Sequence, residues 1–529
     1  MVLGSDARRW ARKTLTTLVG VFVAGSVVAG MPTLASGAGT AVAPLNSSIT
    51  ITTDGWGHGR GMSQYGAQGA ATQGLKYTDI LSFYYPGTTL KSVANGTIRV
   101  WITSDTDNRL GVKPATGLSV KDASGTSLTL PTGTPYTGWQ ISRSGNNRVL
   151  SYLNTAGKPV VYATKLSPTS LWYFYNNSSG TVTLVLGSTT RAYRGQLAYQ
   201  FSGTSGSITV DYVAMEDYLK SVVPSEMPST WAAEALKAQA VAARSYAARY
   251  KLNLGGKKAY DICDTTSCQV YAGTSAERAT SNAAISATAN LTLLYAGQPA
   301  FAEFTSSNGG YSVKGSYPYE VAKADPYDAS MRRYWATNVT SATMAKKYPT
   351  IGTFASITVN SRDGNGPWGG RVTSVTIKGS KTSVTVTGTS FKTTMGLRET
   401  LMEITGGLAT TTANYQRWQA LGGSPGTVLG PPSASETSVA SGLVAPFANG
   451  TLYWSKATAS KMLNGAVLAA YQATGGPSGA LGFPTSDVRA IATPKVPTIK
   501  TGTEATFSVG LISCPTTAKK AADCVVSYG

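Results

Sequence analysis

Short apolar runs separated by turn-forming residues predict that much of the chain folds into β-strands. Between Ser92 and Tyr212, runs rich in Val, Thr, Ile and Tyr alternate with clusters of Gly, Asn and Ser, a pattern typical of strands and turns. A second stretch of this kind lies between Ala355 and Thr387. The predicted strands are 180–186, 196–201, 206–213, 292–295, 355–359 and those within 371–387.

Helical patterns are fewer and lie between the strand-rich stretches. One helix has a well-marked start: Ser229 or Thr230 can cap it, Glu234 falls in its first turn, and an Ala-rich run fills it from Ala235 onward. Helices and strands in this mixture predict an α+β architecture. The predicted helices are 63–74, 231–252 and 276–289.

Just ahead of that helix, Val222–Pro228 places the carboxyl group of Glu226 among uncharged neighbours. A carboxyl group held among apolar groups is poorly solvated when charged, so burial raises its pKa toward the range that a general acid needs. The N-terminus of the following helix favours the anion by about 0.3–1 kcal/mol when exposed, and lowers the pKa. The sequence does not show the burial that decides between these effects.

The C-terminal region repeats itself with a period of about 53 residues. The segment Trp418–Pro432 recurs as Tyr471–Pro484, although the sequence drifts from the pattern beyond Thr485. Self-similarity at a fixed period signals stacked modules. Aromatic residues, such as those of Pro446–Trp454, can stack on sugar rings, although filling the core of the repeat is the commoner use of Trp and Tyr.

Composition favours a secreted, β-rich protein over a cytosolic enzyme. Only 13% of the 529 residues are charged, and the length suggests about two to four domains. The net charge of +20 arises from 45 basic and 25 acidic residues, and implies attraction to anionic surfaces such as wall polymers, with nucleic acid as the alternative. Because no dense Lys/Arg run or nucleic-acid motif accompanies the charge, the wall is favoured and nucleic acid is not expected as a partner.

The N-terminal segment has the pattern of an export signal. Basic residues between 8 and 13 precede nearly continuous apolar sequence from Leu15 to Met31. Small residues around Ala35–Ala38 offer a cleavage site, with Ala41–Ala43 as a second. We therefore predict a signal peptide over 1–38. An uncleaved membrane anchor is the alternative, because the apolar stretch is close to the length that spans a bilayer.

Three consecutive motifs resemble one known family. Glu216–Leu219, Val222–Pro228 and Glu234–Tyr246 look like the core of the stage II sporulation protein D / amidase-enhancer family. Members of that family with demonstrated activity are peptidoglycan lytic transglycosylases, and the Glu of their Glu-Met-Pro motif is the catalytic acid. The resemblance therefore implies that Glu226 is the catalytic residue.

Further blocks resemble the same family. They are a Gly-His-Gly loop at Gly57–Ala67 with Tyr84–Gly87 after it, a Ser-rich strand end with two glycines at Ala302–Tyr311, and a closing segment at Phe391–Arg398. The resemblance implies a β-rich catalytic domain over 48–405, with a few helices around a glycan cleft and a β-rich insert at about 92–190. The Gly-His-Gly block usually closes this domain but opens it here, which is a permuted arrangement.

The motif matches also imply substrate-binding residues. Lys237 and Arg244 would steady developing charge or bind the lactyl group, and His58 would hydrogen-bond sugar hydroxyls. A structural role for His58 within its glycine-rich turn is the alternative. As the single histidine, His58 cannot supply the two His ligands of zinc amidases and most zinc peptidases. The expected substrate-binding residues are His58, Gln64, Lys237, Gln239, Arg244, Ser306 and Asn308.

Four cysteines fit an oxidising compartment. In related proteins the loop around Cys263 and Cys268 can carry zinc, bound partly by a His next to the second Cys. Ser267 occupies that place here, and a hydroxyl is a poor zinc ligand. A disulfide between Cys263 and Cys268 is therefore favoured, and Cys514 with Cys524 is predicted to form a second. No metal or other cofactor is expected.

The C-terminal copies resemble LGFP repeats, which are found on secreted actinobacterial proteins and are thought to bind the cell wall, so 412–529 is predicted to be a wall-binding region.

The resemblance to the stage II sporulation protein D / amidase-enhancer family implies cleavage between N-acetylmuramic acid and N-acetylglucosamine with 1,6-anhydro ends, Glu226 acting as acid and then as base. Expected partners are glycan strands stripped of stem peptides and anionic wall polymers. The alternatives are a non-catalytic activator of a wall amidase or glycan-binding module, and hydrolysis with Glu216 or Glu303 as second carboxylate.

Overall fold

The computed structural model describes residues 42, 44, 48–331, 334–406, 412–421, 428–430, 432–433 and 436–529. These residues form a mixed α/β protein with strand-rich sheets and ten α-helices, which confirms the mixed class predicted from the sequence. The predicted signal peptide, 1–38, lies outside the described residues. Among the helices of the described residues, none is both long and apolar enough to cross a membrane.

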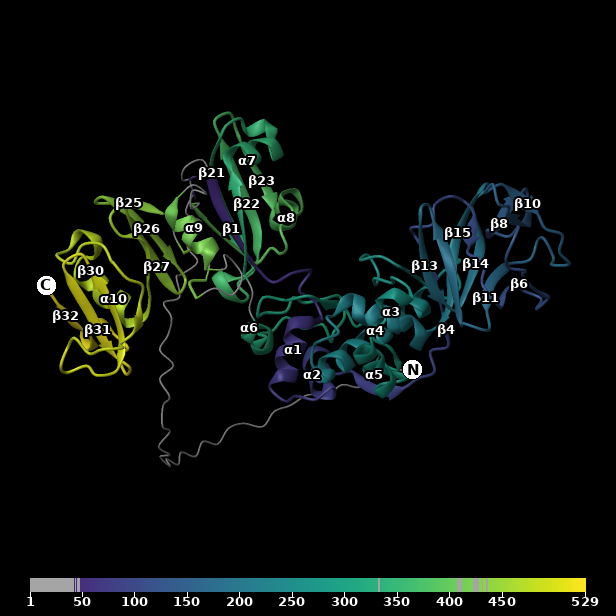
Figure 1. Ribbon diagram of the computed structural model, residues 1–529, viewed down its shortest axis with the longest axis horizontal. Coiled ribbons are helices and arrows are strands. Elements are labelled where there is room, and N and C mark those ends of the chain that lie inside the picture. The colour runs from purple at the N-terminus through teal and green to yellow at the C-terminus, as the bar shows by residue number, and fades with distance from the viewer. Residues whose placement is uncertain are drawn as a thin grey trace, which may run out of the picture. The chain divides into compact units, whose positions relative to one another are not determined.

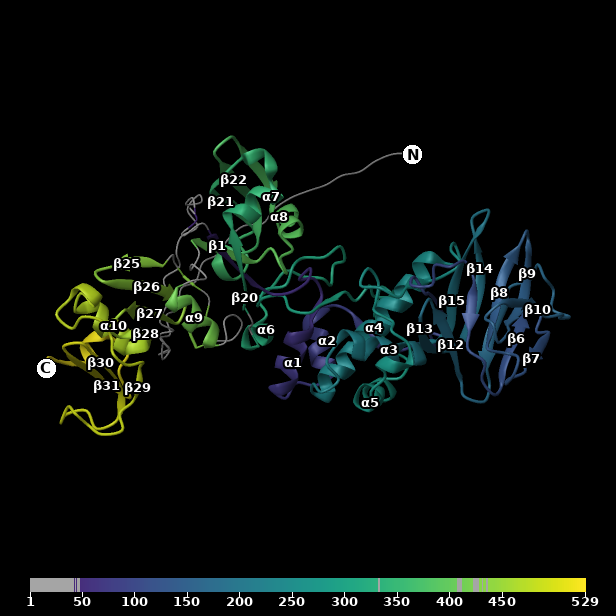
Figure 2. The same ribbon diagram turned by 45° about the horizontal axis from the view of Figure 1, so that its top comes forward.

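Most strands predicted between Ser92 and Tyr212 belong to two sheets. One contains β5 (Leu110–Val112), β8 (Gly138–Ser144), β9 (Asn147–Leu153), β10 (Pro159–Val161), β12 (Thr181–Leu186) and β13 (Thr189–Arg194), in the order β10-β9-β8-β5-β12-β13. The other contains β4 (Thr97–Trp101), β6 (Leu118–Asp122), β7 (Ser127–Thr129), β11 (Trp172–Asn176), β14 (Gln196–Ser202), β15 (Gly206–Ala214) and β16 (Ile262–Cys263), in the order β16-β4-β15-β14-β11-β6-β7. Figures 1 and 2 show these strands as one layered body.

Alternating side chains explain how these two sheets pack together. In β12, Val182 and Leu184 are buried while the residues between and beside them are more exposed, because successive side chains of a strand point to opposite faces. Val182 and Leu184 share one core with Leu197 and Tyr199 of β14. The two sheets therefore form a sandwich, and the predicted strands at 180–186, 196–201 and 206–213 are confirmed as β12, β14 and β15.

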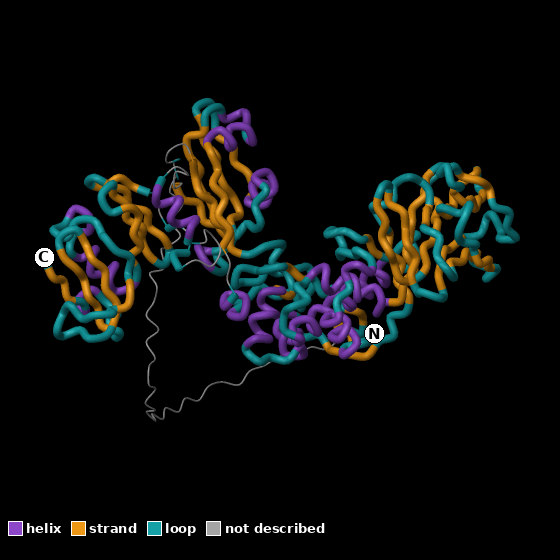
Figure 3. Tube along the Cα trace, viewed as in Figure 1, coloured by secondary structure: helices purple, strands orange, loops and turns teal. Residues whose placement is uncertain are grey.

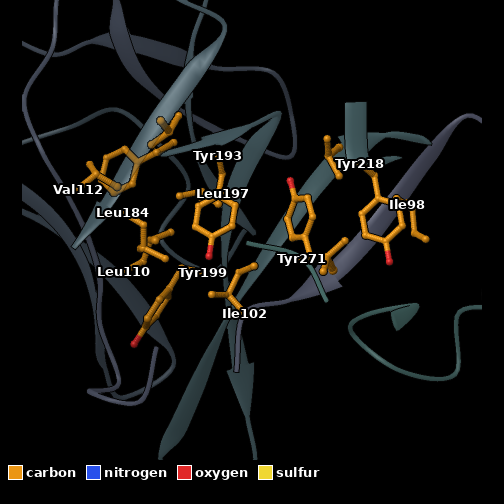
Figure 4. Packing of buried hydrophobic residues seen from close by; sticks show 14 of the residues in the cluster. Ile98, Ile102, Leu110, Val112, Leu184, Tyr193, Leu197, Tyr199, Tyr218 and Tyr271 are labelled. Atoms are coloured by element: carbon orange, nitrogen blue, oxygen red, sulfur yellow. The ribbon is translucent and has the colours of Figure 1, made fainter. Parts of the chain in front are cut away.

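The core of this sandwich continues into α3 (Met215–Glu226), which was not predicted as a helix. The rings of Tyr193, Tyr271 and Tyr218 follow one another, with centroids 5.5 and 5.1 Å apart, as Figure 4 shows. Tyr193 belongs to β13 and Tyr218 to α3. Packing against the sandwich thus fixes the helix that ends at Glu226.

The second predicted helix is α4 (Ala233–Leu254), but neither Ser229 nor Thr230 caps it. The N-cap is Ala232, whose backbone N–H donates to Oε1 of Gln68 at 2.9 Å. A side chain from a neighbouring helix therefore replaces the predicted local cap. The other two predicted helices are confirmed with shorter bounds as α1 (Gln64–Thr72) and α5 (Ala279–Ala287).

A second core lies among α1, α2 (Tyr77–Tyr84), α4 and α5, and includes many small side chains of α4. Figure 3 shows these helices in purple as one group. β17 (Leu291–Tyr295), which confirms the predicted strand 292–295, follows α5 and pairs with β3 (Thr89–Ser92) and β18 (Gln298–Pro299). The Ala-rich sequence of α4 thus lets other elements approach it closely on several sides.

The strand β1 (Ser48–Asp54) lies at the centre of a three-stranded sheet. It pairs antiparallel with β20 (Tyr334–Thr340) and with β24 (Met402–Gly406). The start of the predicted segment 48–405 is thus hydrogen-bonded to its end. The second predicted β stretch is confirmed as a sheet of β21 (Phe354–Arg362), β22 (Val372–Gly379) and β23 (Ser383–Thr387), which shares a core with β1, α7 (Ser341–Lys347) and α8 (Gly388–Met395).

Each copy of the C-terminal repeat contains a helix and a four-stranded antiparallel sheet. The first has α9 (Ala413–Ala420) with β25 (Thr437–Val439), β26 (Gly442–Phe447), β27 (Gly450–Ser455) and β28 (Ala459–Leu463). The second has α10 (Gly465–Ala473) with β29 (Arg489–Ala490), β30 (Gly502–Phe507), β31 (Gly510–Pro515) and β32 (Val525–Ser527). The second copy keeps its sheet despite the sequence drift, and the predicted Cys514–Cys524 disulfide joins parts of it.

The repeated aromatic residues fill the cores of these modules. The indole N–H of Trp418 donates to the carbonyl of Gly430 at 3.3 Å, and the hydroxyl of Tyr471 donates to the carbonyl of Gly482 at 2.6 Å. Both rings are buried. They hold equivalent places, so these two rings have the commoner use of filling the core.

Candidate functional site

Glu226 is the last residue of α3 and lies against the loop that follows β16. Its Oε1 accepts a hydrogen bond from the backbone N–H of Val270 at 2.8 Å. Burial raises the pKa of Glu226, and the Val270 N–H opposes that rise without cancelling it. The sequence left this balance open. The opposing group is this loop amide, whereas α4 begins only at Ala233 and Glu226 itself lies at a helix C-terminus.

Buried polar contacts fix the loop that carries Val270. The side chain of Gln269 is buried, donates to the carbonyl of Ala243 at 3.2 Å and accepts from the hydroxyl of Tyr218 at 3.0 Å. The predicted disulfide between Cys263 and Cys268 is confirmed, with Cα atoms 5.6 Å apart. The described residues contain no group of three or more His, Cys, Asp or Glu side chains arranged to hold a metal ion.

The Gly-His-Gly loop lies against the double-glycine strand end. β2 (Met62–Ser63) pairs in parallel with β19 (Phe304–Thr305), and Trp56 and Ser307 exchange backbone hydrogen bonds of 2.8 and 3.1 Å. A Cβ on Gly57 would lie only 2.1 Å from Oγ1 of Thr305. The two motif blocks, far apart in the sequence, thus form one continuous surface of backbone.

His58 is held in a fixed orientation and is uncharged at neutral pH. Its Nδ1 accepts the backbone N–H of Arg60 at 3.0 Å. Burial and the charges of Arg60 and Lys392 lower the pKa of His58 to about 4, against an opposing effect of Glu303. Because Nδ1 accepts a hydrogen bond, the proton of the neutral ring is on Nε2.

A network of charged groups surrounds that loop. Arg60 forms a bidentate ion pair with Glu303, at 2.8 and 2.7 Å, and this contact holds the pKa of Glu303 below its usual value despite burial. Glu320 is buried beside Glu303, and burial together with the Glu303 charge raises the pKa of Glu320 to about 7. Lys392 donates to the carbonyl of Gly57 at 2.9 Å.

Tyr246 of α4 links the Glu226 region to this network. Burial raises the pKa of the Tyr246 phenol, and the charges of Glu303 and Glu226 raise it further. Tyr246 packs against the core that contains Val222 and Val223 of α3. Tyr246 also packs beside Phe304, with ring centroids 6.2 Å apart.

Three of the predicted substrate-binding residues are fully buried and bind other protein groups. Arg244 forms a bidentate pair with Glu216, at 2.8 and 2.7 Å, and donates to the carbonyl of Leu291. Gln239 accepts from Gln64 at 3.3 Å. Asn308 donates to Asp325 at 2.7 Å. Gln239, Arg244 and Asn308 have no exposed surface, and their side chains bind other protein groups; their contact with a glycan stays a prediction.

Gln64, which donates to Gln239, is also buried, whereas His58, Lys237 and Ser306 are half-buried. Lys237 is half-buried and pairs with Glu234 at 2.7 Å. Ser306 is half-buried, and its carbonyl accepts the backbone N–H of Tyr65. Four residues near the site were not predicted: Arg60, Tyr246, Glu320 and Lys392. Arg60, Tyr246 and Lys392 lie inside the motif blocks, so the family resemblance could have identified them. Glu320 lies outside those blocks, and no sequence pattern indicates it.

Gly61 offers a test of how the two blocks fit together. It has φ +63°, and a Cβ there would lie 1.8 Å from the carbonyl oxygen of Glu303. Because the backbone of Glu303 cannot move away as a flexible side chain could, we expect Gly61→Ala to lower the free energy of unfolding by about 2–4 kcal/mol. Gly74→Ala is the control, since Gly74 also has positive φ but no atom within 4 Å, and only about 1–2 kcal/mol of backbone strain is expected. Equal shifts in urea unfolding would show that the close approach does not require glycine.

The comparisons with known proteins agree with the motif blocks. The pattern of the family Stage II sporulation protein matches residues 204–295, the segment that contains α3, α4 and Glu226. The pattern of the LGFP repeat matches residues 429–479. The blocks around His58, Asn308 and Lys392 lie outside both matches, so the permuted arrangement stays a prediction.

Individual relatives match short parts of the chain. The Amidase enhancer of Bacillus subtilis is 42% identical over 116 residues, which is 21% of this chain and 15% of the relative. The Stage II sporulation protein D of the same organism is 32% identical over 154 residues, 25% of this chain and 45% of the relative. That of Bacillus amyloliquefaciens is 62% identical over 40 residues, 8% and 12% of the two chains. Each match thus spans less than half of the relative. The chain contains a Stage II sporulation protein domain and an LGFP repeat, as its motifs indicated.

Proposed function

We propose that the protein is a secreted, wall-associated lytic transglycosylase of peptidoglycan in which Glu226 is the catalytic acid and base. The observation that carries the proposal is the state of the Glu226 carboxyl group: burial raises its pKa, and one backbone N–H holds its Oε1. No described cation forms an ion pair with it. A carboxyl group in such a place keeps its proton at higher pH than an exposed one, as a general acid must.

The proposed reaction needs only one carboxyl group. Glu226 donates its proton to the oxygen between C1 of N-acetylmuramic acid and the next sugar, and the C1–O bond breaks. The C6 hydroxyl of the same muramic unit attacks C1 and gives its proton to the Glu226 carboxylate. The products are a 1,6-anhydro end and a free hydroxyl end, and Glu226 is protonated again. The nucleophile is already part of the substrate, so no second carboxylate has to activate water.

The neighbouring groups fit assisting roles in this proposal. Neutral His58 carries its ring proton on Nε2, where the backbone carbonyl of Phe304 already interacts with it, so a sugar oxygen would have to share or replace that acceptor. Arg60 keeps Glu303 ionised and paired, which makes Glu303 a poor proton donor. Lys237 and Ser306, both half-buried, stay candidates for contacts with the lactyl and acetamido groups.

Wall association is the part of this proposal with the broadest support. The LGFP repeat is the feature of the chain linked to the wall, and the net charge of +20 favours binding to anionic wall polymers. The relatives named for sporulation and for amidase enhancement point to the same compartment. Peptidoglycan strands are accordingly the proposed partner.

A second function is favoured by one specific observation. The relative that is 42% identical over the segment containing Glu226 is named Amidase enhancer. The chain would then bind glycan strands or a wall amidase and raise the rate of that amidase without cleaving glycan itself. An experiment that identifies the product distinguishes the two functions.

Incubation of the purified chain with glycan strands stripped of stem peptides, followed by mass spectrometry, tests the proposal. We expect 1,6-anhydro ends. Reducing ends would instead indicate hydrolysis, with Glu216 or Glu303 as the second carboxylate. Unchanged strands that co-sediment with the chain, together with a higher rate of a purified wall amidase, would establish the enhancer function and overturn the proposed one.

A further inference from the structure

We propose that a hollow beside α4 binds a muramic acid unit of the glycan strand, away from the bond that is cleaved, and that Arg249 recognises its lactyl carboxylate. The inference rests on the proposed function, because the glycan strand is its substrate. The hollow has a volume of about 190 Å³ and is lined by Arg249, Tyr295, Gln298, Pro299, Tyr317 and Tyr319. Its size suits one sugar unit better than the larger ligands that fill pockets of about 300–1,000 Å³.

A row of aromatic rings connects this hollow to the Glu226 region. The ring of Tyr246 stacks on Phe301 with centroids 4.6 Å apart, and Phe301 lies 5.6 Å from Tyr317. Tyr317 stacks on Tyr319 at 5.4 Å with nearly parallel planes, and Tyr319 lies 5.1 Å from Tyr295. The row therefore begins at Tyr246, which packs against the core that contains Val222 and Val223 of α3, the helix that ends at Glu226, and ends in the hollow.

Several rings of the row keep surface that a sugar can cover. The side chain of Tyr295 is 36% exposed, while Phe301 and Tyr317 are half-buried. Tyr319 is buried, and its hydroxyl accepts the backbone N–H of Phe301 at 2.7 Å. Tyr319 therefore holds the backbone of Phe301 in place within the row. Rings that combine an apolar face with a polar edge suit the apolar face and hydroxyl rim of a sugar.

Arg249 gives the hollow its chemical preference. Among the described residues its Nε has no hydrogen-bond partner although that atom is buried, and its guanidinium carbon lies 5.7 Å from the ring centre of Tyr317. A planar guanidinium binds a carboxylate through two parallel hydrogen bonds. The lactyl group of muramic acid ends in such a carboxylate once the stem peptide has been removed, and in an amide while the peptide is attached. Arg249 would thus select stripped strands.

The test measures binding in a Glu226→Gln background, in which cleavage does not interfere. Arg249→Met keeps the packing on Tyr317 and removes the charged fork. We expect it to weaken binding of stripped strands about 10- to 100-fold, and to leave binding unchanged for strands whose lactyl carboxylates have been converted to amides. Arg249→Lys should recover part of the loss, because it restores the charge but not the fork. Tyr295→Ala should weaken binding of both kinds of strand about 3- to 10-fold.

Matched controls on the sandwich exclude general effects of charge and ring removal. Arg109→Met and Tyr175→Ala remove an exposed arginine and a half-buried tyrosine far along the chain from the hollow. Thermal unfolding checks that every variant is folded. Equal losses for carboxylate and amide strands, or losses no larger than those of the controls, would overturn the inference even if the wild type forms anhydro ends. If the wild type forms none while binding still depends on Arg249 and the carboxylate, the proposed catalysis fails and this binding site stands.

Discussion

Glu226→Gln reduces the formation of anhydro ends about 10³-fold or more, which is the largest effect expected of any single substitution in this protein. Glutamine keeps the shape of the side chain and can still accept the N–H of Val270, but it has no proton to give and cannot take one from the C6 hydroxyl. The rate of anhydro-end formation, followed by mass spectrometry, is the measurement. An unchanged rate would remove Glu226 from the mechanism.

The same substitution is expected to leave the protein at least as stable as the wild type at pH 8. Burial raises the pKa of Glu226 above its ordinary value of 4.5, so the folded state holds this proton to higher pH than the unfolded chain does. As pH rises from the ordinary toward the raised pKa, folding binds a proton and stability falls. Glutamine carries no charge and avoids this loss. Glycan cleavage by the wild type should fall as pH rises through the raised pKa, where the folded protein loses the proton of this acid.

Glu277→Gln is the matched control for this comparison. Glu277 also lies partly buried, but it forms a bidentate ion pair with Arg194 at 2.6 and 2.8 Å. The amide should weaken that pair without changing the rate of cleavage. A similar loss of activity in both variants would indicate that general damage, and not loss of the acid, explains the result.

Arg244→Met lowers the free energy of unfolding by about 3 kcal/mol, which is the largest stability effect we expect of a single polar residue. Arg244 is fully buried and holds both oxygens of Glu216 and the carbonyl of Leu291. Without it, Glu216 loses its ion pair and keeps only the backbone N–H of Asn290, at 3.3 Å, among the contacts of the described residues, and the carbonyl of Leu291 loses the guanidinium. The side chain of Glu216 is 31% exposed, so water partly solvates the stranded carboxylate and the cost lies at the lower end of the range for buried pairs.

The midpoint of urea unfolding measures this change, and Lys220→Met provides the control. Lys220 pairs with Asp217 on the same helix, but both side chains are partly exposed, and such a pair contributes at most about 0.5 kcal/mol. Similar midpoints for the two variants would mean that Arg244 has no special structural role. Glu216 lies in the first turn of α3 and Glu226 ends that helix, so a loosened α3 should also reduce cleavage.

Local sequence patterns predicted many elements because the relevant interactions are short-range. The alternation in β12 and the Ala-rich run of α4 each predict their own element within a few residues. The two disulfides were predictable because their cysteines are close in sequence. The cap of α4 was not, since Gln68 supplies it from a distant segment.

The candidate site was predictable as a set of motifs but not as a geometry. Nothing in the spacing of Gln239, Arg244 and Asn308 reveals that all three point into the protein. Equally, the sequence gives no sign that the charges of Glu226 and Glu303 both raise the pKa of Tyr246. Side-chain direction and burial depend on tertiary contacts, and those were needed to decide that burial outweighs the opposing amide at Glu226.

The place of β1 between β20 and β24 sets a limit on when the molecule can finish folding. This strand leaves the ribosome before its neighbours, and at about 5–20 residues per second the second of them follows roughly tens of seconds later. Pairing across so long a separation is slow, because the entropy of closing the loop is lost before the contacts form. Until Met402–Gly406 has been synthesised, one edge of β1 has no partner and can join another chain. A chaperone that shields this strand during translation would therefore raise the yield of correctly folded protein.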